Sequence, residues 1–228
     1  MNRRVSIVVG LMAVSASVAF AQNLQDRKPA SPPDKPGLQD ALQPPPGMSE
    51  ADMMACIEAA TPGAMHQHLA KSIGVWHGKS TMWMAPDTEP MHSECISTVT
   101  AIMDGRFFKV EIEGDMPGMG AFSGMGIYGF DNVSQKFQST WLDNMSTGMM
   151  IGTGELSSDS KTLSWNFTYN CPITKKPHVM REIERMTGAD TKTLEMHMTD
   201  PISGKEYKMM EIVFTRKPAV TPSRGSAR

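Results

Sequence analysis

Residues 121–156 read AFSGMGIYGFDNVSQKFQSTWLDNMSTGMMIGTGEL. Apolar side chains in this stretch follow a period of two in short runs, and turn-forming residues such as Asp131-Asn132 separate the runs. The pattern predicts three strands, near residues 121–130, 135–143 and 147–156. No linker between them has room for a crossover helix, so we expect neighbouring strands to be antiparallel.

The same alternation continues on both sides of this stretch. Turn signals at Met103–Arg106, Phe130–Val133 and Gly188–Asp190 indicate hairpins. Further strands are predicted near residues 75–84, 93–103, 106–114, 161–169, 178–188, 191–199 and 205–216. About ten sequential strands in an open sheet would expose two long edges. The expected fold is therefore all-β, an up-and-down antiparallel barrel of about ten strands.

Helical signals precede the strands. The segment SEADMMACIEAA offers Ser49 as an N-cap, carries acidic residues in its first turn and stops at Pro62-Gly63. A second short helix is predicted over Met65–Ser72. We therefore expect one or two short N-terminal helices over one end of the barrel.

The first 21 residues have the pattern of a secretory signal. Arg3 and Arg4 form a basic region, Val5–Phe20 is apolar or small, and Ala19-Phe20-Ala21 is a cleavage site before Gln22. This predicts a periplasmic or secreted protein with no membrane span after cleavage. Residues 22–47 are rich in proline and predict a disordered linker, and 218–228 predict a disordered tail. The folded domain is expected over 48–217.

The charge of the chain argues against nucleic acid as a partner. The sequence has 22 basic and 24 acidic residues, and the signal removes two arginines, so 20 basic residues against 24 acidic ones leave a net charge of -4. A mildly acidic chain has no electrostatic footprint for nucleic acid or anionic lipid. Nothing in the sequence indicates an oligomeric state.

Several short motifs within residues 65–217 resemble domain-of-unknown-function family 1579, a family of bacterial proteins. They are His66-x-x-Leu69, Gly74-x-Trp76, Asp104-Gly105-Arg106-Phe107, GMGIYGFD at 124–131, STWLDNMSTGMM at 139–150 and GKEYKMMEIVFTRK at 204–217. The resemblance implies a calycin- or lipocalin-like barrel and no activity. It also implies that Trp76 of the first strand lies at the closed end, beneath Arg216 of the last strand. Cys171 stands where such sequences more often carry an aspartate before a turn.

The methionine content permits two interpretations. The sequence has 22 methionines, and groups such as Met116-x-x-Met119 would suit copper(I). Alternatively, methionine is a flexible lining for an apolar interior. We favour the lining, because alternation from Phe137 and Trp141 places Met145, Met149 and Ile151 on the same strand face.

Other chemistry has weaker support. No histidine spacing indicates zinc, no motif selects His178 or His197 as a haem ligand, and there is no G-x-S-x-G elbow, so we predict no cofactor, no metal and no catalytic residues. The sequence leaves enzymatic activity uncertain and leans against it. Cys56, Cys95 and Cys171 allow at most one intramolecular disulfide, and the sequence does not select a pair.

The leading hypothesis is a barrel that binds a small apolar or amphipathic ligand in its interior. Polar residues on apolar strands would orient such a ligand. Two alternatives stay open: a periplasmic copper(I)-binding protein with Met and His clusters, and a structural or stress-associated domain with a filled core. The candidate ligand-binding residues are Arg106, Tyr128, Trp141, Asp143, Met145, Met149, Met209 and Glu211.

The signal sequence gives a direct test. We expect N-terminal sequencing of exported protein to find Gln22 as the first residue, because the small residues at Ala19 and Ala21 define the cleavage site. Recovery of a chain that keeps its apolar N-terminal segment in washed membranes would contradict the predicted localisation.

Overall fold

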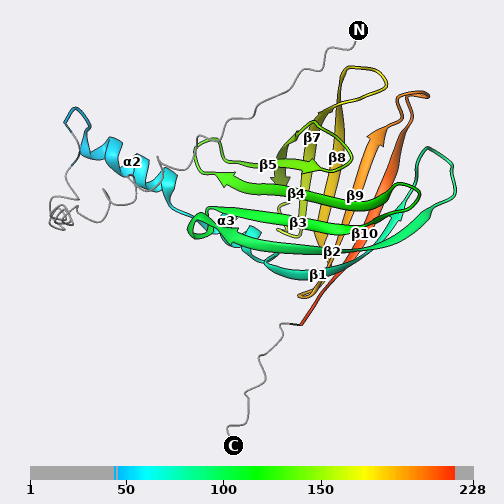
Figure 1. Cartoon of the computed structure of the whole chain (residues 1–228). Coiled ribbons are helices and arrows are strands. Elements are labelled where there is room, and N and C mark those ends of the chain that lie inside the picture. Colours follow the sequence, from blue (N-terminus) through cyan, green and yellow to red (C-terminus); the bar gives the residue numbers. More distant parts are fainter. Residues whose placement is uncertain (1–43, 45, 219–228) are drawn as a thin grey trace, which may run out of the picture. The chain divides into compact units, whose positions relative to one another are not determined.

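A computed structural model describes residues 44 and 46–218 of the chain. The predicted signal peptide, its cleavage site, most of the linker and almost all of the tail lie outside the described residues. Two helices, α2 (Glu50–Ala60) and α3 (Ala64–Ala70), precede the strands (Figure 1). No helix among the described residues is both long enough and apolar enough to cross a membrane.

Ten strands form one closed sheet. They are β1 (Gly74–Met82), β2 (Met91–Ile102), β3 (Phe107–Met116), β4 (Gly120–Asp131), β5 (Lys136–Asp143), β6 (Met150–Leu156), β7 (Thr162–Asn170), β8 (Pro177–Met186), β9 (Thr191–Thr199) and β10 (Glu206–Arg216). Every strand pairs with its sequence neighbours, and β1 pairs with β10. The prediction of an up-and-down antiparallel barrel is confirmed, and every expected strand is present, β9 with the predicted bounds and the others with ends shifted by one to three residues.

The first and last strands close the barrel over seven residue pairs, from Trp76 opposite Arg216 to Met82 opposite Met210. Two further backbone bonds extend this seam. The Lys217 N–H donates to the Val75 carbonyl at 2.7 Å, and the Trp83 N–H donates to the Met209 carbonyl at 2.8 Å. Because the seam is paired along its length, neither terminal strand leaves an open edge.

Trp76 lies at the closed end of the barrel and is completely buried. The Arg216 guanidinium carbon lies 4.0 Å from the centre of its ring, which confirms the arrangement that the family resemblance implied. The Trp76 indole N–H donates to the Ser72 carbonyl at 2.8 Å. Arg216 also donates to the carbonyls of Lys71 and Ile73, so one side chain joins the last strand to the segment between α3 and β1.

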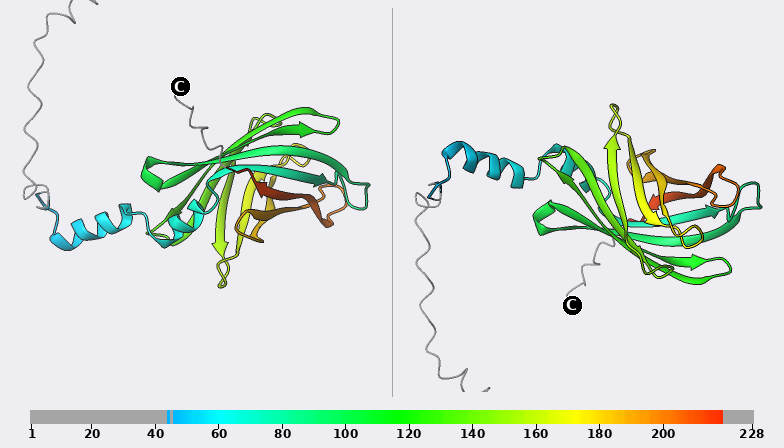
Figure 2. Two further views of the ribbon diagram at one scale, coloured as in Figure 1. Left: turned by 90° about the horizontal axis from the view of Figure 1, so that it is seen from below. Right: turned by 90° about the horizontal axis from the view of Figure 1, so that it is seen from above.

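Helix α3 covers the same end of the barrel, beside the turn between β4 and β5 (Figure 2). The His66 ring packs edge-on against Phe130, and its Nδ1 accepts a hydrogen bond from the Gly63 N–H at 3.1 Å. Burial lowers the pKa of His66, so the neutral ring that can accept this bond is favoured. Leu69 projects from the helix into the hydrophobic core. The His66-x-x-Leu69 motif therefore positions the helix that plugs the barrel.

Helix α2 has no buried residues. Its C-terminal carbonyls are held by two side chains of the barrel. The Asn132 amide donates to the carbonyls of Glu58, Ala59 and Thr61. The Arg106 Nε donates to the Ala60 carbonyl at 3.0 Å. These bonds satisfy carbonyl groups that a helix end leaves unpaired.

Three turns share one design, read as DNVSQK at 131–136, CPITKK at 171–176 and DPISGK at 200–205. In each turn the first carbonyl accepts a bond from the fifth N–H, and the fifth residue has a positive φ of 54°, 57° or 73°. The aspartates at the first position accept a bond from the serine three residues later. Cys171 occupies this position in the middle turn, where bonds from Thr174 lower the pKa of its thiol.

The closure contacts of Arg216 predict a large loss on truncation. We expect Arg216→Met to lower the free energy of unfolding by about 2–4 kcal/mol, because it removes two hydrogen bonds to backbone carbonyls and the contact with Trp76. Urea denaturation followed by tryptophan fluorescence measures this change. Arg181→Met is the matched control, since Arg181 pairs with Glu206 on the exposed surface and should lose little. Equal losses in both variants would contradict this role for Arg216.

The shared turn design predicts that aspartate can replace Cys171. We expect Cys171→Asp to raise the midpoint of thermal unfolding at neutral pH, because a carboxylate accepts the Thr174 bonds more strongly than a thiol does. Cys171→Ala, which has no acceptor, should lower the midpoint. A decrease in both variants, measured by circular dichroism, would show that the middle turn differs from the other two.

Candidate functional site

The barrel contains a partly open cavity of about 210 Å³. Most of its wall is apolar and comes from all ten strands, and Leu69 and Ser72 contribute from the end that α3 covers. Asp115, Phe122 and Asp143 line the cavity from the opposite end of the strands. The interior is therefore not completely filled by its own side chains.

Methionine is a major component of the cavity wall. Three of these side chains lie side by side across the seam, since Met82 is opposite Met210, which is in turn opposite Met196. The lining methionines are Met82, Met116, Met150, Met180, Met196, Met209 and Met210. Unbranched thioether side chains adapt to irregular apolar shapes, so this wall is compliant.

The structure corrects the predicted strand face around Met145. Met145, Met149 and Ile151 are exposed by 40%, 64% and 52%, and none of them lines the cavity. The chain leaves β5 at Asp143 and enters β6 only at Met150, so the intervening loop breaks the alternation. Met150 takes the inward position, and of the three predicted methionines only Met209 lines the cavity.

Two of the predicted polar residues also lie outside the cavity. Arg106 binds the Ala60 and Met103 carbonyls at the end of α2. Glu211 pairs with Lys208 and lies opposite Glu195. A bulge after Lys208 inserts Met209 as an extra residue, so Met209 and Met210 both line the cavity while Glu211 turns away. Alternation alone had placed Met209 and Glu211 on one face.

The structure brings the other four predicted residues, Tyr128, Trp141, Asp143 and Met209, to the cavity wall. The Asp143 carboxylate accepts the Trp141 indole N–H at 3.1 Å and the Met145 backbone N–H at 3.0 Å. Its oxygens are therefore used to hold the Trp141 ring and the loop that follows β5. Burial raises the pKa of Tyr128 well above its usual value, and the nearby Glu182 acts in the same direction.

An interior group of charged residues was missed by the sequence reasoning. Lys192 is 6% exposed, and its Nζ lies 2.8 Å from a Glu184 carboxylate oxygen. The same ammonium lies 4.9 Å from the centre of the Trp76 ring. The spacing Met180-x-Glu182-x-Glu184 could have indicated these interior acids, because it places two carboxyl groups on the same strand face as a methionine.

Glu182 differs from Glu184 because it has no partner. It is 4% exposed and lines the cavity, yet its carboxyl group makes no hydrogen bond or ion pair with any residue that the structure describes. Burial and, to a lesser extent, the neighbouring Glu184 raise the pKa of Glu182 to about 8, although Lys192 partly offsets the shift. The carboxyl group is therefore mostly neutral at pH 7.

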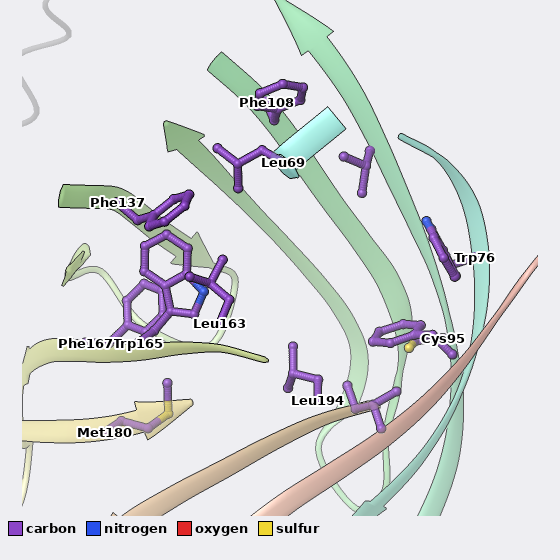
Figure 3. Packing of buried hydrophobic residues seen from close by; sticks show 13 residues of the cluster. Leu69, Trp76, Cys95, Phe108, Phe137, Leu163, Trp165, Phe167, Met180 and Leu194 are labelled. Carbon is purple, nitrogen blue, oxygen red and sulfur yellow. The ribbon is translucent and has the colours of Figure 1, made fainter. Parts of the chain in front are cut away.

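Trp165 lies directly opposite Glu182 in the pairing of β7 with β8 and is completely buried. Its ring packs edge-on against Tyr128 at 5.3 Å and lies beside Phe167 and Leu163 (Figure 3). Gly154 on β6 makes room for it, since a Cβ there would lie 2.7 Å from the ring. The indole N–H is buried and has no acceptor among the described residues.

Cysteine and histidine residues add no reactive centre to the cavity. Cys56, Cys95 and Cys171 are all free thiols, and of these only Cys95 lines the cavity. Burial raises the pKa of Cys95 to about 11, which makes it a poor nucleophile. His178 and His197 do not line the cavity. The described part of the chain contains no group of three His, Cys, Asp or Glu residues placed to hold a metal ion.

Comparison with solved structures shows the same type of fold in proteins of low sequence identity. The Rv2717c protein of M. tuberculosis has 14% identity and a TM-score of 0.50, over 69% of this chain and 99% of that one. The S-type phycobiliprotein lyase CPES of Guillardia theta has 11% identity and a TM-score of 0.52, over 72% of this chain and 97% of that one. At these identities the likeness concerns the fold alone.

Comparison with curated proteins found no match. The family profile described as "Protein of unknown function (DUF1579)" matches residues 61–216, which include α3 and all ten strands. The chain therefore belongs to the DUF1579 family.

Proposed function

We propose that this protein binds a small, mainly apolar molecule inside the barrel. The observation that carries the proposal is the cavity of about 210 Å³, whose apolar wall contains a few inward polar groups. Ligand sites in proteins have this composition, with apolar contacts supplying affinity and a few polar groups fixing orientation. The S-type lyase shows that a barrel of similar fold occurs in a protein that acts on another molecule, which supports the proposal only by analogy.

The size of the cavity limits the ligand. A protein cavity of about 150 Å³ holds benzene, and pockets for drug-sized molecules begin at about 300 Å³. The volume of about 210 Å³ therefore suits a molecule of one or two rings or a short acyl chain. The flexible methionines in the wall would let it accept related shapes.

The alternatives gain less from the structure. Among the methionines of 116–150 proposed for copper(I), Met116 and Met150 line the cavity, whereas Met119, Met145 and Met149 are exposed. Methionines divided between the cavity wall and the exposed surface do not form one copper(I) site. For an enzyme, the Cys95 thiol of the cavity wall would be a poor nucleophile, because burial holds it in its protonated form. We place the binding activity outside the cytoplasm on the basis of the N-terminal signal pattern.

Filling part of the cavity should weaken binding. Tetralin, a two-ring hydrocarbon, is the probe, and we expect Val110→Phe to weaken its binding at least about tenfold, because Phe adds four carbon atoms to the cavity wall. Val179→Phe is the matched control, since Val179 is 54% exposed and does not line the cavity. Isothermal titration calorimetry on the full chain measures both affinities.

Two results would contradict the proposal. The first is no saturable binding of tetralin or of related small hydrocarbons by the unmodified chain. The second is equal weakening by Val110→Phe and Val179→Phe, which would place the bound probe on the surface. Circular dichroism of each variant confirms that the barrel is folded before binding is compared.

A further inference from the structure

Two polar groups in the barrel wall have no partner among the residues that the structure describes. The carboxyl group of Glu182 faces the cavity from β8, and the indole ring of Trp165 lines it from β7. The two residues are directly opposite in the strand pairing, so their side chains leave the sheet next to each other. Neither the Glu182 carboxyl nor the Trp165 N–H finds a hydrogen-bond partner among the described residues.

Such groups are unusual in a protein interior. More than nine in ten buried polar groups are hydrogen-bonded, because an unpaired one forfeits its bonds to water. Among the described residues the Trp165 N–H is such a group, and the Glu182 carboxyl, which opens onto the cavity without a protein partner among those residues, lies directly opposite it. An unpaired donor beside an unpaired acid is readily explained by a ligand that binds both.

The surroundings determine the charge of the pair. The titratable or charged side chains facing Glu182 are Glu184 on its own strand, Lys192 on β9 and Tyr128 on β4. Lys192 is already paired with Glu184 at 2.8 Å. Ionisation of Glu182 would therefore place an extra negative charge beside Glu184 in an apolar wall, and the neutral acid is favoured.

A neutral carboxylic acid and an indole N–H are both hydrogen-bond donors. We propose that the ligand carries one uncharged acceptor oxygen, such as a ketone, aldehyde or ester carbonyl, that binds between Glu182 and Trp165. The inference rests on the proposed function and adds the chemistry of the ligand's polar end. An anionic ligand would meet the negative charge of Glu184. A cationic ligand would leave the Trp165 N–H without an acceptor.

Three matched probes test this assignment on the full chain at pH 6.5. Tetralin has no polar group, 1-tetralone adds a carbonyl to the same skeleton, and 1-aminotetralin adds an ammonium group. We expect the chain to bind 1-tetralone about tenfold more tightly than tetralin, since a carbonyl would pair two buried donors. 1-Aminotetralin should bind no better than tetralin. Isothermal titration calorimetry gives each affinity.

Variants then identify the groups responsible. Glu182→Met removes the donor and should abolish the preference for 1-tetralone while tetralin still binds. Glu182→Gln keeps an N–H donor and should keep most of the preference. Trp165→Phe should reduce it. Glu155→Gln is the control, since Glu155 lies outside the cavity and pairs with Lys136 on the exposed surface.

The pH dependence separates the carboxyl group from the indole. The preference of the unmodified chain for 1-tetralone should be constant below about pH 7 and fall as the pH rises through about 8, where Glu182 ionises and ceases to donate. Glu182→Gln should show no such fall, because its amide does not titrate.

The outcomes distinguish this inference from the proposed function. Equal binding of tetralin and 1-tetralone, or a preference that survives Glu182→Met, would overturn the role of the pair while leaving an apolar binding site. Preferred binding of 1-aminotetralin that strengthens as the pH rises would overturn it in favour of a site for cations. Absence of binding by all three probes would overturn both proposals.

Discussion

The pairing of β1 with β10 is the constraint on which the rest of the barrel depends. Without it, two strands would present unpaired N–H and carbonyl groups along their whole length, and the interior would open to water. Arg216 secures this seam at one end, because it covers Trp76 and binds carbonyls in the segment that leads from α3 into β1. The Arg216 side chain therefore contributes both to the closure of the sheet and to the covering of the barrel end.

Closure also determines what the interior contains. Two inward positions of β6 are glycines, and the space that Gly152 and Gly154 leave is occupied by Phe167 and Trp165 of the neighbouring strand. Methionines line the wall elsewhere and keep it compliant. A buried ion pair between Glu184 and Lys192 crosses from β8 to β9 and leaves Glu182 as the unpaired acid. The same wall thus combines an apolar surface for a ligand with two donors that would orient it.

Three of the errors in the predicted site, at Met145, Met149 and Glu211, have a common cause, since these residues were assigned to a face by counting in steps of two. Counting fails wherever the chain departs from regular strand geometry. The loop after Asp143 moved Met145 and Met149 outside and Met150 inside, and the bulge at Met209 turned Glu211 away from the cavity. Tyr128 and Trp141 lie in uninterrupted strands, and both were placed correctly at the inner wall.

Local patterns in the sequence were sufficient for ten strands, their antiparallel order and the need for closure, because alternation and turn residues act over a few positions. The resemblance to the family further predicted the contact between Trp76 and Arg216, which the structure contains. Only the tertiary structure decided which acids lack a partner, since Glu182, Glu184 and Lys192 look alike as charged residues until the strands are paired. Burial and pairing are properties of the assembled barrel, and they are what set the chemistry of its interior.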